Sequence, residues 1–168
     1  GCSEMMGVEL MVNFKAPYFA LSMRDFWKRW HISLTSWFRA DVYFPLGGSR
    51  RGFARTLRNT LIVFALSGLW HGASWTFVAW GLLHALYLCA ELIWNRLRRS
   101  APKAPGPCRK ALLLLKTFVL ACIAWTFFRA DTMADALAIL GAAFAGLRHP
   151  LTWMQDAWHL LTAGGALT

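Results

Sequence analysis

Among the five histidines of this 168-residue chain, His71 has the surroundings that most favour chemistry. It lies in the sequence GLWHG, Gly68 to Gly72, within a stretch, 59–90, that contains no Asp, Glu, Lys or Arg. A protonated imidazole is costly in hydrocarbon, so a histidine here is expected to be neutral and to face a protein-lined or wet cavity. A neutral imidazole, with an unperturbed pKa of about 6.5, can take a proton from an alcohol that attacks an acyl group.

The residue type alone leaves a structural role open for His71, since polar side chains in membrane bundles often hydrogen-bond a neighbouring helix. His84 follows thirteen residues later and would face another direction on a continuous helix. It is therefore not an obvious metal partner for His71, and a structural role is favoured for it. His149 and His159 lie near the ends of weakly patterned segments and carry no functional signal.

A second candidate, His31, lies on an amphipathic helix that the sequence predicts over 22–42. Ser22 and Asp25 stand three residues apart, as in a capping box that opens a helix. Most of the apolar side chains of 26–39 share one arc of about 120°, and the basic and hydroxyl side chains lie opposite. Such a helix is expected to lie in the membrane interface rather than to cross the bilayer. His31 is at the margin of the two faces, where it is either a solvated side chain or a functional group.

The stretch 59–90 predicts the element that positions His71. As a single helix, its 32 residues would be about 48 Å long, well beyond the hydrocarbon core of about 30 Å. Two passes joined at the glycines around His71 fit better, so a broken membrane hairpin is predicted over 57–95. His71 is 13 residues beyond Arg58, about 20 Å along a helix, which places it well inside the bilayer.

The remaining apolar segments favour an all-α fold of polytopic membrane helices. A membrane helix is expected over 111–129 and an apolar helix over 133–147, and a cytoplasmic linker over 96–110 that contains three prolines precedes them. Basic residues gather between the apolar runs, in the blocks 50–58 and 96–110, which is the positive-inside pattern. A nucleic-acid-binding domain would instead need basic and aromatic side chains on one soluble face. The net charge of +10 therefore indicates a membrane surface rather than a nucleic-acid partner.

Metal and disulfide chemistry are not expected from the cysteines. The chain has four, none of them in a CxxC motif or near a histidine at metal-ligand spacing: Cys2, Cys89, Cys108 and Cys122. Free cysteines commonly act as small apolar side chains, so these are expected to be unpaired. The sequence predicts no metal ion and no tightly bound cofactor.

Four blocks of the sequence, in a fixed order, resemble a known family. The blocks are DFWKRWHISLTSWFR (25–39), YFPLGGSRRG (43–52), SGLWHGASWTFVAWGLLHALY (67–87) and AWTFFRAD (124–131). They resemble the membrane-bound O-acyltransferases (MBOAT), most closely the bacterial branch that includes alginate O-acetyltransferases and the teichoic-acid D-alanyl transfer protein. The resemblance covers most of 13–140, and four ordered blocks are far more specific than any one motif.

The resemblance implies roles for two histidines. The near-invariant histidine of the family's tryptophan-histidine-glycine block corresponds to His71, which is expected to be the catalytic base. The histidine of the bacterial branch's tryptophan-histidine-x-serine block corresponds to His31. It is expected to be a second essential residue that positions the donor or the acceptor.

The sequence also departs from the family pattern at two places. The family's arginine-aspartate-tyrosine run is replaced by Arg39, Ala40 and Asp41, which moves the acidic group by one position, or about 100° on a helix. His84 is followed by Ala85, where the family commonly has histidine and glycine. The resemblance therefore assigns no role to His84 and leaves the effect of the Asp41 shift open.

The resemblance further implies O-acetylation of an exported polysaccharide such as alginate, with an acyl thioester, acetyl-CoA or a carrier-protein thioester, as donor. Family members are longer, so residues 1–168 are expected to form the C-terminal part of a multi-pass protein of the bacterial inner membrane and to be inactive alone. The expected partners are the missing N-terminal part, the lipid bilayer and periplasmic acetyl-transfer or polysaccharide-modifying proteins, with no nucleic acid.

Two other classes of protein remain as alternatives. A transporter or proton-relay subunit also uses broken helices and buried histidines, but it predicts further intramembrane acids or lysines near His71, and 59–90 has none. A membrane-anchoring fragment predicts that His31 and His71 lie far apart and are sealed in packing. The acyltransferase hypothesis predicts that both histidines face one cavity.

Overall fold

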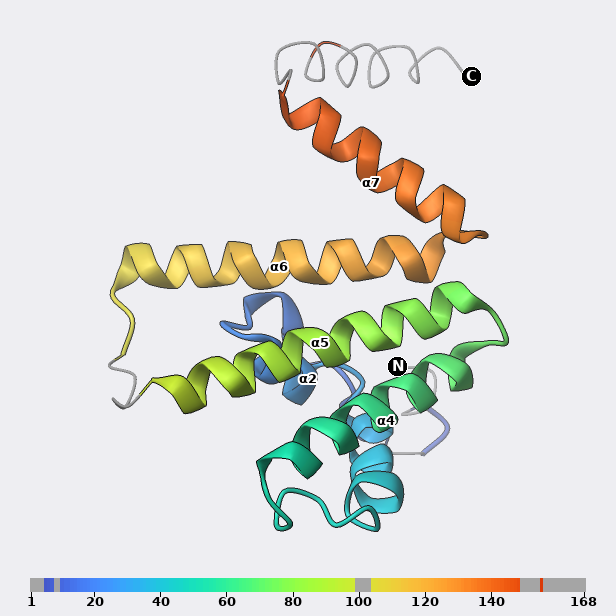
Figure 1. The fold of residues 1–168 in the computed structure, drawn as a ribbon, viewed down its shortest axis with the longest axis vertical. Helices are drawn as coiled ribbons and strands as arrows, with labels where there is room; N and C mark the ends of the chain where they lie inside the picture. Colours follow the sequence, from blue (N-terminus) through green and yellow to red (C-terminus); the bar gives the residue numbers. More distant parts are fainter. Residues whose placement is uncertain (1–4, 8–9, 99–103, 149–154, 156–168) are drawn as a thin grey trace.

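The chain folds as a series of helices (Figure 1). The computed structural model describes residues 5–7, 10–98, 104–148 and 155. The helices are the 3-10 helix η1 (Pro17–Phe19), α2 (Met23–Arg29), α3 (Ile32–Trp37), the π-helix η2 (Phe38–Tyr43), α4 (Phe53–His71), α5 (Trp75–Leu97), α6 (Pro107–Arg129) and α7 (Met133–Arg148). No β-strand occurs in the residues described, which confirms the all-α prediction.

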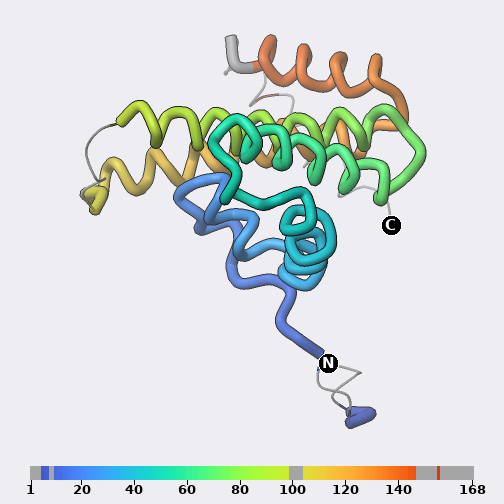
Figure 2. The backbone as a smooth tube through the Cα atoms, turned by 60° about the horizontal axis from the view of Figure 1, so that its bottom comes forward, coloured from blue at the N-terminus to red at the C-terminus, as the bar shows by residue number. Residues whose placement is uncertain are grey.

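Helix α5 is the centre of the arrangement. It packs against α4 and α6, and α7 packs mainly on α6 (Figure 1). The segment from residue 10 to residue 50 lies against the other side of these helices, with α2 on α5, η1 on α6 and η2 on α4 (Figure 2). The two segments that carry His31 and His71 are therefore held together by helix packing.

The hairpin predicted over 57–95 forms as α4 and α5, and it breaks where the glycines predict. Helix α4 ends at His71, and Gly72 is its C-cap. The side chain of Ser74 begins α5 by accepting the backbone N–H of Thr76 at 3.3 Å. An N-cap serine and a C-cap glycine are the usual signals for helix ends, and they account for the break.

Two of the described helices, α5 and α6, are long and apolar enough to cross a membrane. Helix α4 is not one of them, and its first two turns carry Arg55 and Arg58. Helix α6 begins earlier than the predicted residue 111, since Pro107 suits the first position of a helix. The apolar helix expected over 133–147 forms as α7.

The single amphipathic helix predicted over 22–42 is divided into three elements. Ser22 caps α2 as expected, because its side chain accepts the N–H of Asp25 at 3.1 Å. The helix then ends at Arg29, and His31 adopts the left-handed conformation, with φ 44° and ψ 57°. An α-helix cannot continue through a left-handed residue, so α3 starts anew at Ile32.

Helices α4 and α5 approach so closely that glycine is required on both. A Cβ on Gly68 would meet the backbone carbonyl oxygen of Phe77, and a Cβ on Gly81 would meet that of Phe64. Small residues at such crossings let two backbones come together, as in membrane helix pairs. The glycine of the GLWHG block at position 68 is thus a packing residue.

Replacing Gly81 by Ala should lower the thermal unfolding midpoint of the detergent-solubilised full-length protein. The added methyl group forces α4 and α5 apart, and overpacking of this kind typically destabilises by about 1–3 kcal/mol. Gly141→Ala is the matched control, because a Cβ at this α7 position meets nothing within 4 Å. Ala favours helix over Gly, so the control should be neutral or slightly stabilising. Equal midpoints for the two variants would contradict the close crossing.

Candidate active site

His31 lies in the turn between α2 and α3 in a conformation that few non-glycine residues adopt. Such backbone strain persists only where the surrounding structure enforces it, and it is concentrated at functional sites. The imidazole Nδ1 is buried and has no hydrogen-bond partner among the described residues. The His31 side chain is therefore partly buried, and its Nδ1 is available to hydrogen-bond a ligand.

His71 is the last residue of α4 and is enclosed by aromatic rings. The ring centres of Trp80 and Phe128 each lie 5.1 Å from that of His71, both edge-to-face, and that of Trp70 lies at 5.2 Å. These rings come from α4, α5 and α6, so three helices fix the position of one imidazole. These contacts leave the His71 side chain partly buried.

The structure brings His31 and His71 together, although 40 residues separate them in the sequence. The link between them is Trp80, whose ring centre lies 5.1 Å from that of His71 and 6.0 Å from that of Trp27, in the helix that leads to His31. This arrangement differs from that expected of a membrane-anchoring fragment, in which the two side chains lie far apart. Their chemical roles remain predictions.

A large cavity lies beside the two histidines rather than around them. Its volume is about 550 Å³, and its walls come from α2, α3, η2, the 44–49 turn, α4 and α5. Neither His31 nor His71 is among its lining residues, so this cavity does not meet the expectation that both histidines face one cavity. Ser67 of α4 does line it, and it lies one helical turn before His71 on the same face.

The charges around this cavity are mainly basic. Three exposed cationic side chains, Arg24, Lys28 and Arg39, contribute to its lining together with the carboxylate of Glu91. The interior surface is largely apolar, with hydroxyl groups from Thr56, Thr60 and Ser67 in a row along α4. A pocket with a basic mouth and an apolar wall suits a ligand that combines a phosphate with a less polar arm.

His84 makes the kind of structural contact that the sequence favours, although its partner could not be predicted. The side chain is 1% exposed, and its Nδ1 accepts a hydrogen bond from Nε1 of Trp27 at 3.3 Å. Its other nitrogen, Nε2, is buried without a partner in the described part of the chain. Trp80 lies between the two histidines of the hairpin, with its ring centre 5.1 Å from both His71 and His84. No local signal predicts this bond, because Trp27 and His84 are 57 residues apart in the sequence.

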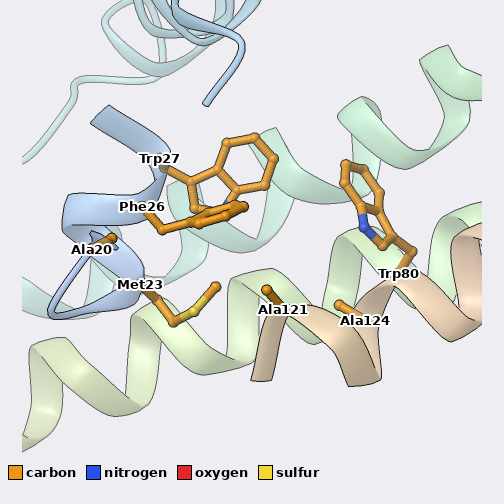
Figure 3. Close-up of a cluster of buried hydrophobic side chains, with 7 residues drawn as sticks. All are labelled: Ala20, Met23, Phe26, Trp27, Trp80, Ala121 and Ala124. Atoms are coloured by element: carbon orange, nitrogen blue, oxygen red, sulfur yellow. The ribbon is translucent and has the colours of Figure 1, made fainter. Parts of the chain in front are cut away.

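A cluster of apolar side chains joins the His31 segment to the hairpin. Met23, Phe26 and Trp27 of α2 face Trp80 of α5, while Ala121 and Ala124 contribute from α6 (Figure 3). The two alanines are almost completely buried, and their small size lets α6 approach. Because α2 ends next to His31 and Trp80 touches His71, this cluster sets the distance between the two histidines.

Glu91 anchors α2 to α5. Its Oε2 accepts the backbone N–H groups of Met23 at 3.0 Å and Arg24 at 3.4 Å, which are the first two of α2. A helix leaves its first N–H groups without partners, and a carboxylate there is favoured by both hydrogen bonding and the helix dipole. The acid that ends the uncharged stretch 59–90 therefore holds the segment that leads to His31.

Glu91→Gln should lower the thermal unfolding midpoint of the full-length protein modestly. The amide oxygen can still accept a hydrogen bond, but the charge is lost, and a charge at a helix N-terminus contributes about 0.3–1 kcal/mol. Glu91→Ala should lower it further, because the two N–H groups then lose their acceptor. Asp131→Asn, at an exposed carboxylate, is the control. A Glu91→Ala midpoint equal to that of the control would show that the anchor contributes nothing.

The remaining predicted positions are simpler to place. Asp41, which departs from the family pattern, is exposed in the π-helix η2. Cys89, Cys108 and Cys122 are free thiols, as expected. Cys2, His149 and His159 lie outside the described residues.

Comparison with known proteins identifies the family. Residues 6–134 match the model of the membrane-bound O-acyltransferase family. The chain is 40% identical over 145 residues to the probable alginate O-acetylase AlgI of Pseudomonas fluorescens, covering 86% of this chain and 28% of the relative. It is also 40% identical over 140 residues to the peptidoglycan O-acetyltransferase of Helicobacter pylori, covering 83% of this chain and 26% of that protein.

A more distant relative has a different acyl group in its name. The teichoic acid D-alanyltransferase of Streptococcus thermophilus is 33% identical over 108 residues, which is 60% of this chain and 26% of the relative. The chain thus spans less than a third of the length of each of these three proteins. The family match covers α2 to α6 and the whole His31–His71 region, so the chain belongs to the membrane-bound O-acyltransferase family.

Proposed function

We propose that the full-length protein is an O-acyltransferase that moves an acetyl group from a thioester to a hydroxyl of an exported polysaccharide such as alginate. The observation that carries the proposal is the placement of the His31 turn and His71 around one aromatic cluster, in which Trp80 lies 5.1 Å from His71 and 6.0 Å from Trp27. Two relatives at 40% identity have O-acetylation in their names, which favours acetyl over D-alanyl as the acyl group.

In the proposed reaction, His71 accepts the hydroxyl proton as the hydroxyl oxygen forms a bond to the thioester carbonyl carbon. The carbon–sulfur bond then breaks, and the proton passes to the departing thiolate, so the products are an ester and a free thiol. A thioester is already activated, and the acceptor itself is the nucleophile, so no serine or cysteine of the protein is needed. His31 holds the donor or the acceptor through its free Nδ1.

The proposed donor enters from the cytoplasmic side, by way of the cavity beside the histidines. Acetyl-CoA and a carrier protein's thioester both join a phosphate to a long, less polar arm. Arg24, Lys28 and Arg39 supply positive charge for the phosphate, and the hydroxyl row on α4 runs toward the turn that ends at His71. The basic residues of this region also agree with a cytoplasmic face.

The proposed setting is a multi-pass protein of the bacterial inner membrane. Helices α5 and α6 supply two candidate spans, and the rest of the full-length protein would supply further ones. Acylation of an exported polymer needs an acceptor on the far side of the membrane, so periplasmic acetyl-transfer or polysaccharide-modifying proteins are the proposed partners. No acid or lysine lies between 59 and 90, which disfavours a proton-relay subunit as the alternative.

The test uses membrane vesicles from cells that produce the full-length protein. The vesicles are supplied with a labelled acetyl group, either on coenzyme A or on an acyl carrier protein, and with alginate or peptidoglycan as acceptor. Label that becomes bound to polymer and is released by mild base, as an ester is, would support the proposal. Incorporation no greater than in vesicles without the protein, for both donors and both acceptors, would contradict it.

A further inference from the structure

The turn that carries His31 is held by a residue far from it in the sequence. Asn13 Oδ1 accepts the backbone N–H of Ser33 at 3.0 Å and the hydroxyl of Ser33 at 2.6 Å. The backbone carbonyl of Asn13 accepts the N–H of Ile32 at 3.0 Å. Next to it, the N–H of Lys15 donates to the carbonyl of Arg29 at 2.9 Å. Residues 13–15 therefore bind both ends of the turn.

Asn13 caps the N-terminus of α3, a task that the N-cap residue itself usually performs. Ile32 and Ser33 are the first two residues of α3, and their N–H groups have no acceptor within the helix. His31 occupies the N-cap position, but its side chain makes no capping hydrogen bond. A capping residue normally satisfies these N–H groups with its own side chain. Here Asn13 satisfies them from outside, so the imidazole of His31 is left free.

The same contacts explain how His31 keeps a left-handed backbone. Residues with a Cβ rarely adopt a positive φ unless neighbouring contacts impose it. With Ile32 and Ser33 bonded to Asn13 on one side and Arg29 bonded to Lys15 on the other, the backbone of the turn has little freedom to relax. Phe14 adds a side-chain contact, since its ring centre lies 4.9 Å from that of Trp30 and 6.1 Å from that of His31.

We propose that Asn13 is a positioning residue for acyl transfer: it caps α3 in place of His31 and so holds the His31 imidazole in place, with Nδ1 unoccupied. This inference rests on the proposed function in assigning a reaction role to His31. The proposal gives Asn13 no contact with the substrate or with the reacting atoms. Its effect on the reaction passes through the geometry of the His31 turn.

The experiment compares three variants of the full-length protein in membranes. Asn13→Leu has a similar size but no acceptor oxygen, whereas Asn13→Asp keeps the oxygens that accept from Ser33. Asn95→Leu, an equivalent change at an exposed position of α5, is the matched control. Two quantities are measured for each: kcat and KM for acetyl transfer, and the rate at which diethylpyrocarbonate modifies His31, followed by peptide mass spectrometry.

The expected result is a selective loss in Asn13→Leu. Its kcat should fall about tenfold to a hundredfold with little change in KM, since misplacement of a reacting group by about 1 Å can lower a rate a hundredfold. His31 should be modified at a rate several-fold different from that in the unaltered protein. Asn13→Asp should restore much of both quantities, and Asn95→Leu should match the unaltered protein.

Two results would overturn the inference. The first is an unchanged modification rate of His31 in Asn13→Leu, which would show that Asn13 does not set the turn. The second is an altered modification rate with unchanged kcat, which would show that transfer does not depend on this geometry. Failure of the proposed function is distinct, because the unaltered protein would then transfer no acetyl group, while the modification rates would still show whether Asn13 holds His31. If Asn13→Leu does not accumulate, Ser33→Ala, which removes only the 2.6 Å bond, gives the same comparison with a smaller expected effect.

Discussion

Replacing His71 by Ala in the full-length protein should lower polysaccharide O-acetylation by about 10²- to 10⁴-fold, the usual contribution of general acid–base catalysis. His71 is the proposed acceptor of the hydroxyl proton, and its ring contacts are with Trp70, Phe77, Trp80 and Phe128. The measurement is the number of acetyl esters per sugar in the exported polymer. His71→Gln, which keeps a polar side chain, should be nearly as inactive.

Two controls separate chemistry from folding in this experiment. Leu69→Ala removes an exposed side chain two residues before His71 and should leave acetylation close to normal. The amount of protein in the membrane and its thermal unfolding midpoint should be similar for the His71 and Leu69 variants. Undiminished acetylation in His71→Ala, with normal protein levels, would remove His71 from the chemistry.

The second large loss of acetyl transfer is expected when His31 is replaced. Glycine and alanine variants separate the role of the imidazole from that of the backbone conformation. Both remove the imidazole, but only glycine adopts the observed φ of 44° without strain. Alanine in a left-handed conformation is disfavoured by about 1–2 kcal/mol, so His31→Gly should be the more stable of the two variants in thermal unfolding. Acetyl transfer should fall at least about a hundredfold in both, since the imidazole is the group that acts.

The two His31 variants also test the purely structural explanation of this residue. If His31 served only to form the turn, glycine would preserve the turn and most of the activity. An active His31→Gly beside an inactive His31→Ala would therefore assign the residue to folding alone. The measurement is the same ester content of the polymer, referred to the amount of folded protein.

The hairpin was predictable from sequence because its signals are local. Glycine at position 72 and serine at position 74 are near-neighbour signals for the end of one helix and the start of the next. The length of the uncharged stretch also exceeds what one membrane pass can hold, which requires a break. The N-cap of α2 at Ser22 was predictable for the same reason, since its hydrogen bond joins residues three positions apart.

The break at His31 could not be predicted in this way. A helical wheel over 26–39 assumes a continuous helix, whereas the turn is imposed by hydrogen bonds from Asn13, which lies 20 residues before Ser33. The buried bond from Trp27 to His84 spans 57 residues, and the Glu91 contact to α2 spans 68. Tertiary contacts of this range override local propensity, and a single sequence contains no direct record of them.

The candidate site, like the fold, was predictable from sequence only in part. The motif resemblance selected His31 and His71 from five histidines, but neither composition nor spacing indicates that they lie in the same region of the fold. Their proximity follows from the packing of α2 on α5 through Phe26, Trp27 and Trp80, together with the close crossing of α4 and α5. A cavity was expected around both histidines, but the lining of the observed one could not be predicted, because its walls come from five helices separated in the sequence.

The central claim, that His31 and His71 act in one reaction centre, is tested most directly by a double-mutant cycle. Acetyl transfer from a labelled thioester to alginate is measured in membranes that contain the unaltered full-length protein, His31→Gly, His71→Ala or both changes. Residues that act as a unit are strongly non-additive, so the double variant should lose no more activity than the more severe single variant. Losses that multiply in the double variant would show that the two histidines act independently and would contradict a shared centre.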